Sequence, residues 1–216
     1  MKIIVFDTET TGLPESRNTS ILETDKWPHV VQISWILYDT DACTVINMQD
    51  HVITCPIPIP LEASLIHGIT DKLVRRKGVS ITFALDLFDH DLLNADLVVA
   101  HNISFDKRMC MVEAIRLKRK QYFTTNGVRK PEYCTMHQTK DLCALERTSL
   151  KGFVYNKYPT LAELHYKLFN CLPKGTHDSM ADVLICLRCY VYVNGAVDVI
   201  KTNRKLGKSY ELYCGT

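Results

Sequence analysis

The N-terminal part of the chain is dominated by runs of β-branched and aromatic residues. Residues 2–6 form a continuous apolar run, which is typical of a strand that is covered on both faces. Two further runs, residues 30–38 and 44–54, are separated by an Asp-Thr-Asp segment whose side chains favour a hairpin turn. We therefore predict that the chain opens with three strands of one sheet, with residues 2–6 in its centre.

Helical spacing replaces the strand pattern after the proline-rich segment 55–60. Apolar residues at positions 61, 65 and 66 predict a short helix, and a second series over residues 80–92 predicts a longer one. The pattern also predicts one further strand and three further helices, at 97–100, 104–118, 160–169 and 179–192.

A capping box marks the start of one of these helices. Thr160 and Glu163 have the spacing at which two side chains satisfy the exposed amide groups of a first helical turn. Strands that come first and are followed by alternating strands and helices predict an α/β plan of three layers with a mixed sheet. The length of 216 residues favours one domain, 1–216, with a core over about 2–192 and a short basic tail over 193–216.

Composition bounds the setting in which the chain works. No apolar run approaches the roughly 20 residues that span a bilayer, and Met1-Lys2 leads straight into a strand without a cleavage site, so we expect neither a membrane span nor a signal peptide. Nine cysteines without a secretory signal indicate reduced thiols and a cytoplasmic or nuclear setting. Cys186 and Cys189 have the spacing of half a zinc site, but no second pair completes it, so we expect core thiols.

Charge alone does not indicate a partner. The net charge of +2 is small, and single basic clusters are commonly solvated helix ends or loops, so they become informative only beside a site. The clusters are Arg75 to Lys77, Arg116 to Lys120, Arg129-Lys130 and Lys201 to Lys208.

A pair of carboxylates follows the first strand. Asp7 ends a run that packing should bury, where an unpaired carboxylate would cost several kcal/mol. If strand geometry continues for two residues, Asp7 and Glu9 project to the same face and repel each other unless a divalent cation such as Mg²⁺ lies between them. Alone, the pair also has an ordinary structural explanation, in which Asp7 caps a turn and Glu9 is solvated.

Two later segments place similar chemistry at a strand end and a helix start. Segment 98–106 delivers an Asn at a strand end and an Asp in the following helical turn, and segment 177–182 has a His five residues before an Asp. Together with segment 7–13 (Asp-Thr-Glu-Thr-Thr-Gly-Leu), they resemble, in order, the three motifs of the DEDDh, or DnaQ-like, exonuclease family. Segments 66–70 and 134–136 also resemble stretches of that family, and the resemblance covers about residues 2–192.

The resemblance implies an RNase H-like fold, a three-layer α/β/α arrangement with a mixed five-stranded sheet. It also implies two Mg²⁺ ions, with Mn²⁺ as a substitute, about 3.5 to 4 Å apart so that they clamp the attacking and leaving oxygens of a phosphoryl displacement. Asp7 would bridge both ions, and a histidine suits a base that works near neutral pH. The implied catalytic set comprises four metal-binding carboxylates and one general base: Asp7, Glu9, Asp106, Asp182 and His177.

A pocket for the terminal nucleotide should lie beside these groups. Gly12 lacks a Cβ atom, so a substrate can approach the backbone amides near it closely. Stacking and sugar contacts rather than base-edge contacts are expected, with low sequence specificity; Phe105 has an alternative role as a core residue. The loop-like residues 172–176 would let His177 move over the substrate. The expected substrate-binding residues are Thr8, Thr10, Gly12, Leu13, Ile66, His67, Asn102 and Phe105.

We therefore expect a 3′-to-5′ exonuclease that hydrolyses DNA from single-stranded ends or the 3′ ends of duplexes and releases nucleoside 5′-monophosphates. The wording of segment 7–13 is similar to that of proofreading DNA exonucleases, such as the epsilon subunit of bacterial DNA polymerase III, which makes a DNA polymerase a candidate partner in proofreading or DNA repair. The short basic tail favours a stand-alone nuclease. Two alternatives stay open, an exoribonuclease of the same family, because two-metal chemistry is indifferent to the sugar, and an idle module that binds nucleic acid or a polymerase.

Overall fold

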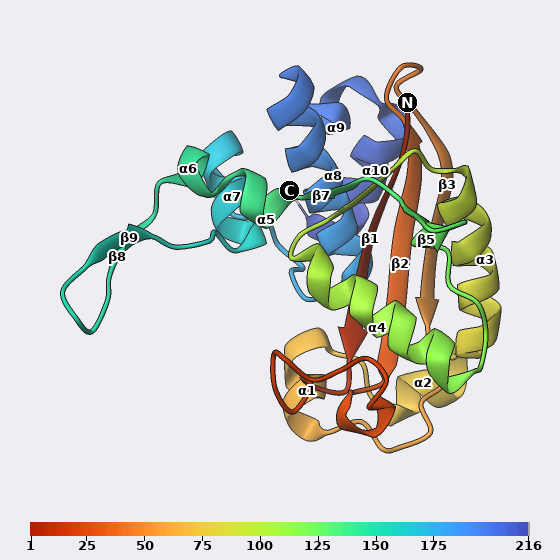
Figure 1. Ribbon diagram of the computed structural model, residues 1–216. Coiled ribbons are helices and arrows are strands. Elements are labelled where there is room, and N and C mark those ends of the chain that lie inside the picture. The colour runs from red at the N-terminus through yellow and green to blue at the C-terminus, as the bar shows by residue number, and fades with distance from the viewer. Residues whose placement is uncertain (216) are drawn as a thin grey trace.

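A mixed sheet lies at the centre of the computed structural model, which describes residues 1–215 (Figure 1). Its strands run in the order β3-β2-β1-β4-β7, with β1 in the middle. β1 pairs antiparallel with β2 and parallel with β4, while β2 pairs antiparallel with β3 and β4 parallel with β7. The predicted mixed five-stranded sheet is thus confirmed. In chain order the strands are β1 (Lys2–Thr10), β2 (Val30–Asp39), β3 (Thr44–Val52), β4 (Leu97–Ala100) and β7 (Glu132–Cys134).

Helices cover both faces of this sheet and make three layers (Figure 1). Along β1, Ile4 and Phe6 point into one hydrophobic core, whereas Ile3 and Val5 point into a second core on the opposite face. This alternation follows from the period of two in a strand, and it explains why residues 3–6 are apolar without a break. The first core includes α3 (Ile81–Asn94) and α4 (Ile103–Arg116), and the second includes α7 (Leu161–Phe169), α8 (Ser179–Gly195) and α10 (Arg204–Cys214).

Two local predictions are confirmed by hydrogen bonds. Thr160 Oγ1 accepts from the Glu163 amide at 3.2 Å and Glu163 Oε2 accepts from the Thr160 amide at 2.8 Å, so the capping box starts α7. In the β2–β3 turn, Asp39 Oδ1 accepts hydrogen bonds from the amides of Asp41 and Ala42. Cys186 and Cys189 are buried in α8 as core thiols.

Several elements lie outside the predicted ones. Residues 193–216 were expected to be a short basic tail. In the described part, up to residue 215, α9 (Val199–Thr202) and α10 follow α8, and Leu206, Tyr210 and Cys214 are buried against it. The spacing of four between these residues places them on one side of a helix. α1 (Leu61–His67) confirms the short helix predicted from positions 61, 65 and 66. The remaining elements are η1 (Thr24–Lys26), α2 (Asp71–Lys77), β5 (Thr124–Thr125), β6 (Val128–Arg129), α5 (Thr135–Gln138), α6 (Lys140–Cys143), β8 (Glu146–Thr148) and β9 (Val154–Asn156).

The β8–β9 hairpin projects from the body of the protein as an arm (Figure 1). Within residues 1–215, no helix has the length and apolar character needed to cross a membrane.

Candidate active site

The carboxyl end of the central strand carries the first two acidic residues. β1 continues to Thr10, so Asp7 and Glu9 keep strand geometry and project to the same face, as the sequence analysis required. The hydroxyl of Ser179, at the start of α8, donates to the Asp7 carbonyl oxygen at 2.7 Å. This bond, which the sequence analysis did not foresee, fixes the first turn of α8 against the end of β1.

Asp106 comes from the neighbouring parallel strand. β4 ends at Ala100, and Asn102 takes a left-handed conformation, with φ of 64°, which turns the chain into α4. Asp106 lies in the first turn of that helix, and its Oδ1 accepts from both the amide (3.0 Å) and the hydroxyl (2.8 Å) of Thr8. Parallel pairing of β1 and β4 therefore brings Asp106 beside the acidic end of β1.

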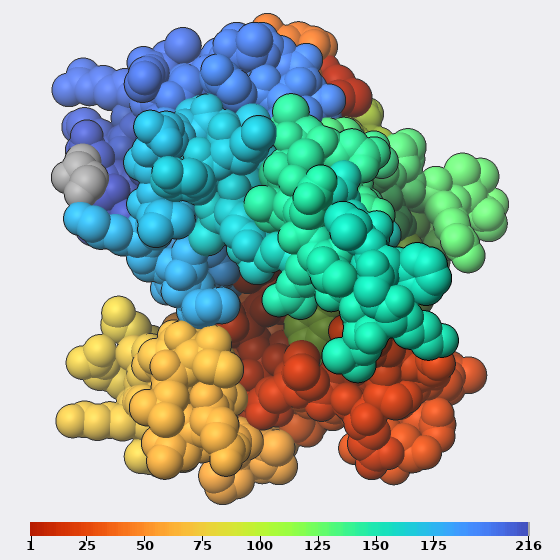
Figure 2. Space-filling model, turned by 90° about the vertical axis from the view of Figure 1, so that its left-hand side faces the viewer, coloured from red at the N-terminus to blue at the C-terminus, as the bar shows by residue number. Residues whose placement is uncertain are grey.

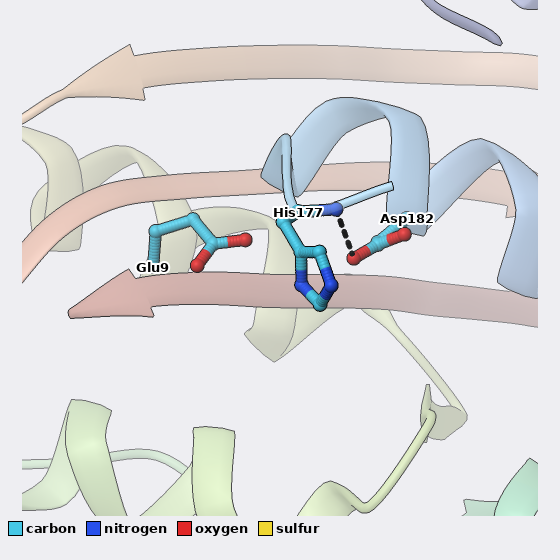
Figure 3. A group of neighbouring side chains, drawn as sticks. All are labelled: Glu9, His177 and Asp182. Carbon is cyan, nitrogen blue, oxygen red and sulfur yellow. Dashed lines mark hydrogen bonds between the residues drawn. The ribbon is translucent and has the colours of Figure 1, made fainter. Parts of the chain in front are cut away.

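Asp182 and His177 come from the start of α8. Asp178 caps this helix by accepting from two amides of its first turn, so Asp182 falls one turn further along the same end. Asp182 Oδ2 accepts from the His177 amide at 3.2 Å. Ligand atoms of Glu9, His177 and Asp182 all lie within 4.8 Å of one another, and Figure 3 shows the three side chains around one space between β1 and α8.

The loop that carries His177 rests on the last helix. The amide of Lys174 donates to the carbonyl oxygen of Cys214 at 3.2 Å. Gly175 has φ of +72°, and a Cβ atom there would clash with the carbonyl oxygen of Tyr213. His177 itself has φ of +70°, a left-handed conformation that costs a residue with a side chain of order 1 kcal/mol or more. The contact with α10 thus supports this loop in an unfavourable backbone conformation, and the expected movement of His177 stays a prediction.

The four carboxylates are crowded in a poorly solvated space. Burial and the neighbouring carboxylates raise the pKa of Asp7 well above its ordinary value and that of Glu9 to about 9. Burial likewise raises the pKa of Asp106 to about 7 and that of Asp182 to about 6. Within residues 1–215 no Lys or Arg forms an ion pair with any of the four, so no Lys or Arg offsets the negative charge that they carry when ionised.

The donor set fits a divalent cation of the kind that prefers oxygen ligands. In the described part of the chain, Asp182 Oδ1 is buried and has no hydrogen-bond partner. A buried, unpartnered carboxylate oxygen is costly unless a cation satisfies it. Asp182 forms the group of three with Glu9 and His177. Asp7 and Asp106 lie outside this group, but their carboxylates interact electrostatically with Asp182.

A pocket of about 340 Å³ opens beside the carboxylates, and seven of the eight expected substrate-binding residues line it. The exception is Asn102, which lines an adjoining pocket. Gly12 has φ of 152°, so the position requires glycine for its backbone conformation, and Thr10 Oγ1 donates to its carbonyl oxygen at 2.7 Å. Phe105 packs against the first core and also lines the pocket, and its contact with a substrate stays a prediction. The sequence analysis missed four lining residues: Thr11, Pro60, Glu62 and Ala63.

The layers are arranged as in RNase H-like proteins, and acidic residues gather at the end of the central strand. Together with the family match that follows, this indicates a nuclease, an enzyme that hydrolyses phosphodiester bonds. The chain belongs to the RNase T exonuclease family, whose model matches residues 4–190. No curated protein sequence matches the chain.

Solved structures share the fold. Escherichia coli Exonuclease I in complex with a dA16 oligonucleotide is similar with a TM-score of 0.63 and 20% identity over 94% of this chain and 43% of that one. The same enzyme with a dT13 oligonucleotide has a TM-score of 0.65 and 19% identity, over 96% of this chain and 45% of that one. Exonuclease X in complex with 5′ overhanging duplex DNA has a TM-score of 0.53 and 19% identity, over 96% of this chain and 99% of that one. The chain therefore spans less than half of the Exonuclease I chains but nearly the whole of Exonuclease X.

Proposed function

We propose that this protein is a metal-dependent 3′-to-5′ exonuclease that removes nucleotides from single-stranded ends of DNA and releases nucleoside 5′-monophosphates. The observation that carries the proposal is the meeting of Glu9, His177 and Asp182 ligand atoms within 4.8 Å, next to Asp7 and Asp106. Residues 1–215 would act as one domain, because α10 packs on α8 and on the loop that carries His177.

The carboxylates would hold two Mg²⁺ ions, with Asp7 contacting both and Mn²⁺ able to substitute. When bound, the ions supply positive charge to the phosphate as negative charge develops on its oxygens. Glu9 and Asp182 would serve the ion nearer the attacking water, and Asp106, held by two bonds from Thr8, would serve the other.

His177 would act as the general base. Its side chain faces the space between Glu9 and Asp182, and its main-chain amide is bonded to Asp182 (Figure 3). A proton taken from the attacking water would move to the imidazole, which is exposed to solvent and can release it there.

The pocket beside the carboxylates would hold the 3′-terminal nucleotide. Leu13 and Ile66, which are 81% and 60% exposed, offer apolar surface to a base, and the backbone around Gly12 offers close approach to its sugar. Apolar contact of this kind is tolerant of sequence. The preference for DNA is supported by the amino-acid sequence of segment 7–13 and by the DNA complexes of the structures that share the fold.

Incubation with Mg²⁺ and 5′-labelled single-stranded DNA, duplex DNA and RNA tests the proposal. The wild type should shorten single-stranded DNA fastest, from its 3′ end, while Asp7→Asn and His177→Ala should be almost inactive. Asp25→Asn, which changes an exposed carboxylate outside the three motif segments, is the matched control and should keep full activity.

Calorimetric titration with Mn²⁺ separates the two kinds of defect. Asp7→Asn should lose binding of the ion, whereas His177→Ala should retain it. Activity that survives in Asp7→Asn would contradict the metal assignment, and faster shortening of RNA than of DNA would identify a ribonuclease. A wild type that binds all three substrates and hydrolyses none would instead identify an idle binding module.

A further inference from the structure

A second pocket, of about 660 Å³, adjoins the first and shares Leu13 and Phe105 with it. It lies between the loop that follows β1 and the segment that runs from α5 to the end of the β8–β9 arm. Figure 2 shows the surface hollowed there, with the green-to-teal segment over the red N-terminal loop. The other lining residues are Pro14, Arg17, Asn102, Ser104, Arg108, Met136, His137 and Tyr158.

Two aromatic side chains stand together in the wall of this second pocket. The rings of His137 and Tyr158 have centroids 4.9 Å apart and planes inclined by 41°. Tyr158 is 50% exposed although it is in contact with its neighbours, so a large part of its ring is open to a ligand. An exposed, fixed ring of this kind is a surface on which a nucleic-acid base can stack.

The same pocket is positively charged. Arg108 donates from Nη1 to the carbonyl oxygen of Arg17 at 3.0 Å, and its guanidinium lies 4.9 Å from the Trp27 ring. Lys140 lies 5.2 Å above the ring of Tyr158. Arg17 and Arg108 line the pocket, which has no Asp or Glu in its lining, and Lys140 lies beside it. No carboxylate of residues 1–215 forms an ion pair with Arg17, Arg108 or Lys140. Their charge is therefore available to an anion.

His101, a half-buried histidine directly after β4, connects the two segments that carry these aromatic side chains. Its Nε2 lies 3.1 Å from the carbonyl oxygen of Pro159, and its Nδ1 lies 2.9 Å from Oγ1 of Thr135. Because a carbonyl can only accept, Nε2 carries the proton and Nδ1 accepts from the hydroxyl. Burial lowers the pKa of this histidine to about 4, so the ring is neutral at pH 7. One side chain thus ties down the residue next to Tyr158 and the helix that carries His137.

We propose that the second pocket binds the nucleotides that precede the 3′-terminal one in a single-stranded nucleic acid. Tyr158 and His137 would stack on a base, while Arg17 and Arg108 would contact phosphates. The proposal rests on the proposed function, because it takes the first pocket as the site of the terminal nucleotide. The occupant follows from continuity: the two pockets share a wall, and the second combines a stacking surface with unpaired positive charge.

Binding is measured first, on the Asp7→Asn protein, so that no hydrolysis intervenes. The probe is a fluorescein-labelled single-stranded dT8, followed by fluorescence anisotropy. Adding Tyr158→Ala should raise the Kd about tenfold, and Tyr158→Phe should restore it because the ring is retained. Tyr166→Ala, which removes a tyrosine of equal exposure (51%) outside the pocket, is the matched control. Arg108→Gln should lower the slope of log Kd against log salt by about 0.7, the value for one lost contact to a single strand.

Catalysis then locates the effect. The nitrophenyl ester of thymidine 5′-monophosphate offers one nucleotide, whereas dT8 offers the preceding ones as well. Tyr158→Ala should lower the ratio of kcat/KM for dT8 to kcat/KM for the ester about tenfold, mainly through KM for dT8, whereas Tyr166→Ala should leave this ratio at the wild-type value.

The outcomes are distinct. An unchanged Kd for dT8 in Tyr158→Ala, or an equal loss on both substrates, would overturn the second pocket as a nucleotide site. A wild type that hydrolyses neither substrate would refute the proposed function, yet a Kd that depends on Tyr158 would still uphold the pocket.

Discussion

Replacing Asp182 with asparagine is expected to stabilise the metal-free protein at pH 8 while it abolishes activity. Burial raises the pKa of this carboxyl group to about 6 in the folded protein, against an ordinary value of 3.8. A raised pKa means that the folded state favours the protonated form. The associated stability is present below about pH 4 and is lost as the pH rises through 6.

The magnitude follows from the gap between the two pKa values. At about 1.4 kcal/mol for each pH unit, the gap corresponds to about 3 kcal/mol at pH 8. Because Asp182 is partly exposed, we expect solvent to screen part of this and the measured gain in Asp182→Asn to be about 2 kcal/mol. Asparagine keeps an oxygen that can accept from the His177 amide, so the hydrogen bond of the wild type is retained.

Urea denaturation in EDTA at pH 4.5 and pH 8 measures the effect. Asp182→Asn should exceed the stability of the wild type at pH 8, and the difference should be much smaller at pH 4.5. Excess Mg²⁺ should stabilise only the wild type. Asp198→Asn is a control with the opposite pH dependence. Burial alone would raise the pKa of Asp198, but the hydrogen bonds and charge of Arg188 lower it below its ordinary value. The stabilisation from Asp198 is therefore present at pH 8 and lost on acidification. Equal stability of wild type and Asp182→Asn at pH 8 without metal would refute the reasoning.

Three further substitutions have expected outcomes. Gly175→Ala should place a methyl group against the carbonyl oxygen of Tyr213 and force a left-handed alanine, lowering kcat several-fold and stability by about 1 kcal/mol or more; an unchanged kcat would contradict the role of this contact. Thr160→Ala should remove a helix cap and lower the free energy of unfolding by about 1 kcal/mol without changing kcat, as measured by urea denaturation. Thr8→Val should remove one of the two bonds to Asp106, raise the pKa of that carboxyl further and weaken Mn²⁺ binding in calorimetry, while Thr8→Ser should retain it.

Local patterns in the sequence were sufficient for the centre of the fold. The apolar run at residues 3–6 predicts a doubly covered strand because both of its faces meet a core, and the capping box at Thr160 needs only neighbours along the chain. The three segments with motif resemblance lie at the ends of β1 and β4 and the start of α8, so the sheet topology brings their acidic residues together. Their catalytic roles stay predictions for the experiments above.

Contacts between segments that are distant in the sequence could not be predicted from such local patterns. Gly175 is constrained by the backbone of Tyr213, and nothing near either residue in the sequence indicates that they meet. The second pocket likewise depends on Arg17 and Tyr158, which are far apart in the chain and carry no motif. The spacing of the apolar residues in α10 was visible in the sequence, but its basic residues favoured an exposed tail, and only packing against α8 decides between the two.

The contact between α10 and the loop of His177 has a consequence for the order in which activity is acquired during synthesis. Every strand of the sheet and all four carboxylates precede residue 183, whereas the backbone that shapes the loop lies at residues 213 and 214. A nascent chain can therefore assemble its acidic cluster before His177, the proposed general base, is held in position. We expect such a chain, or one cut short before α10, to bind divalent ions while hydrolysing phosphodiester bonds poorly.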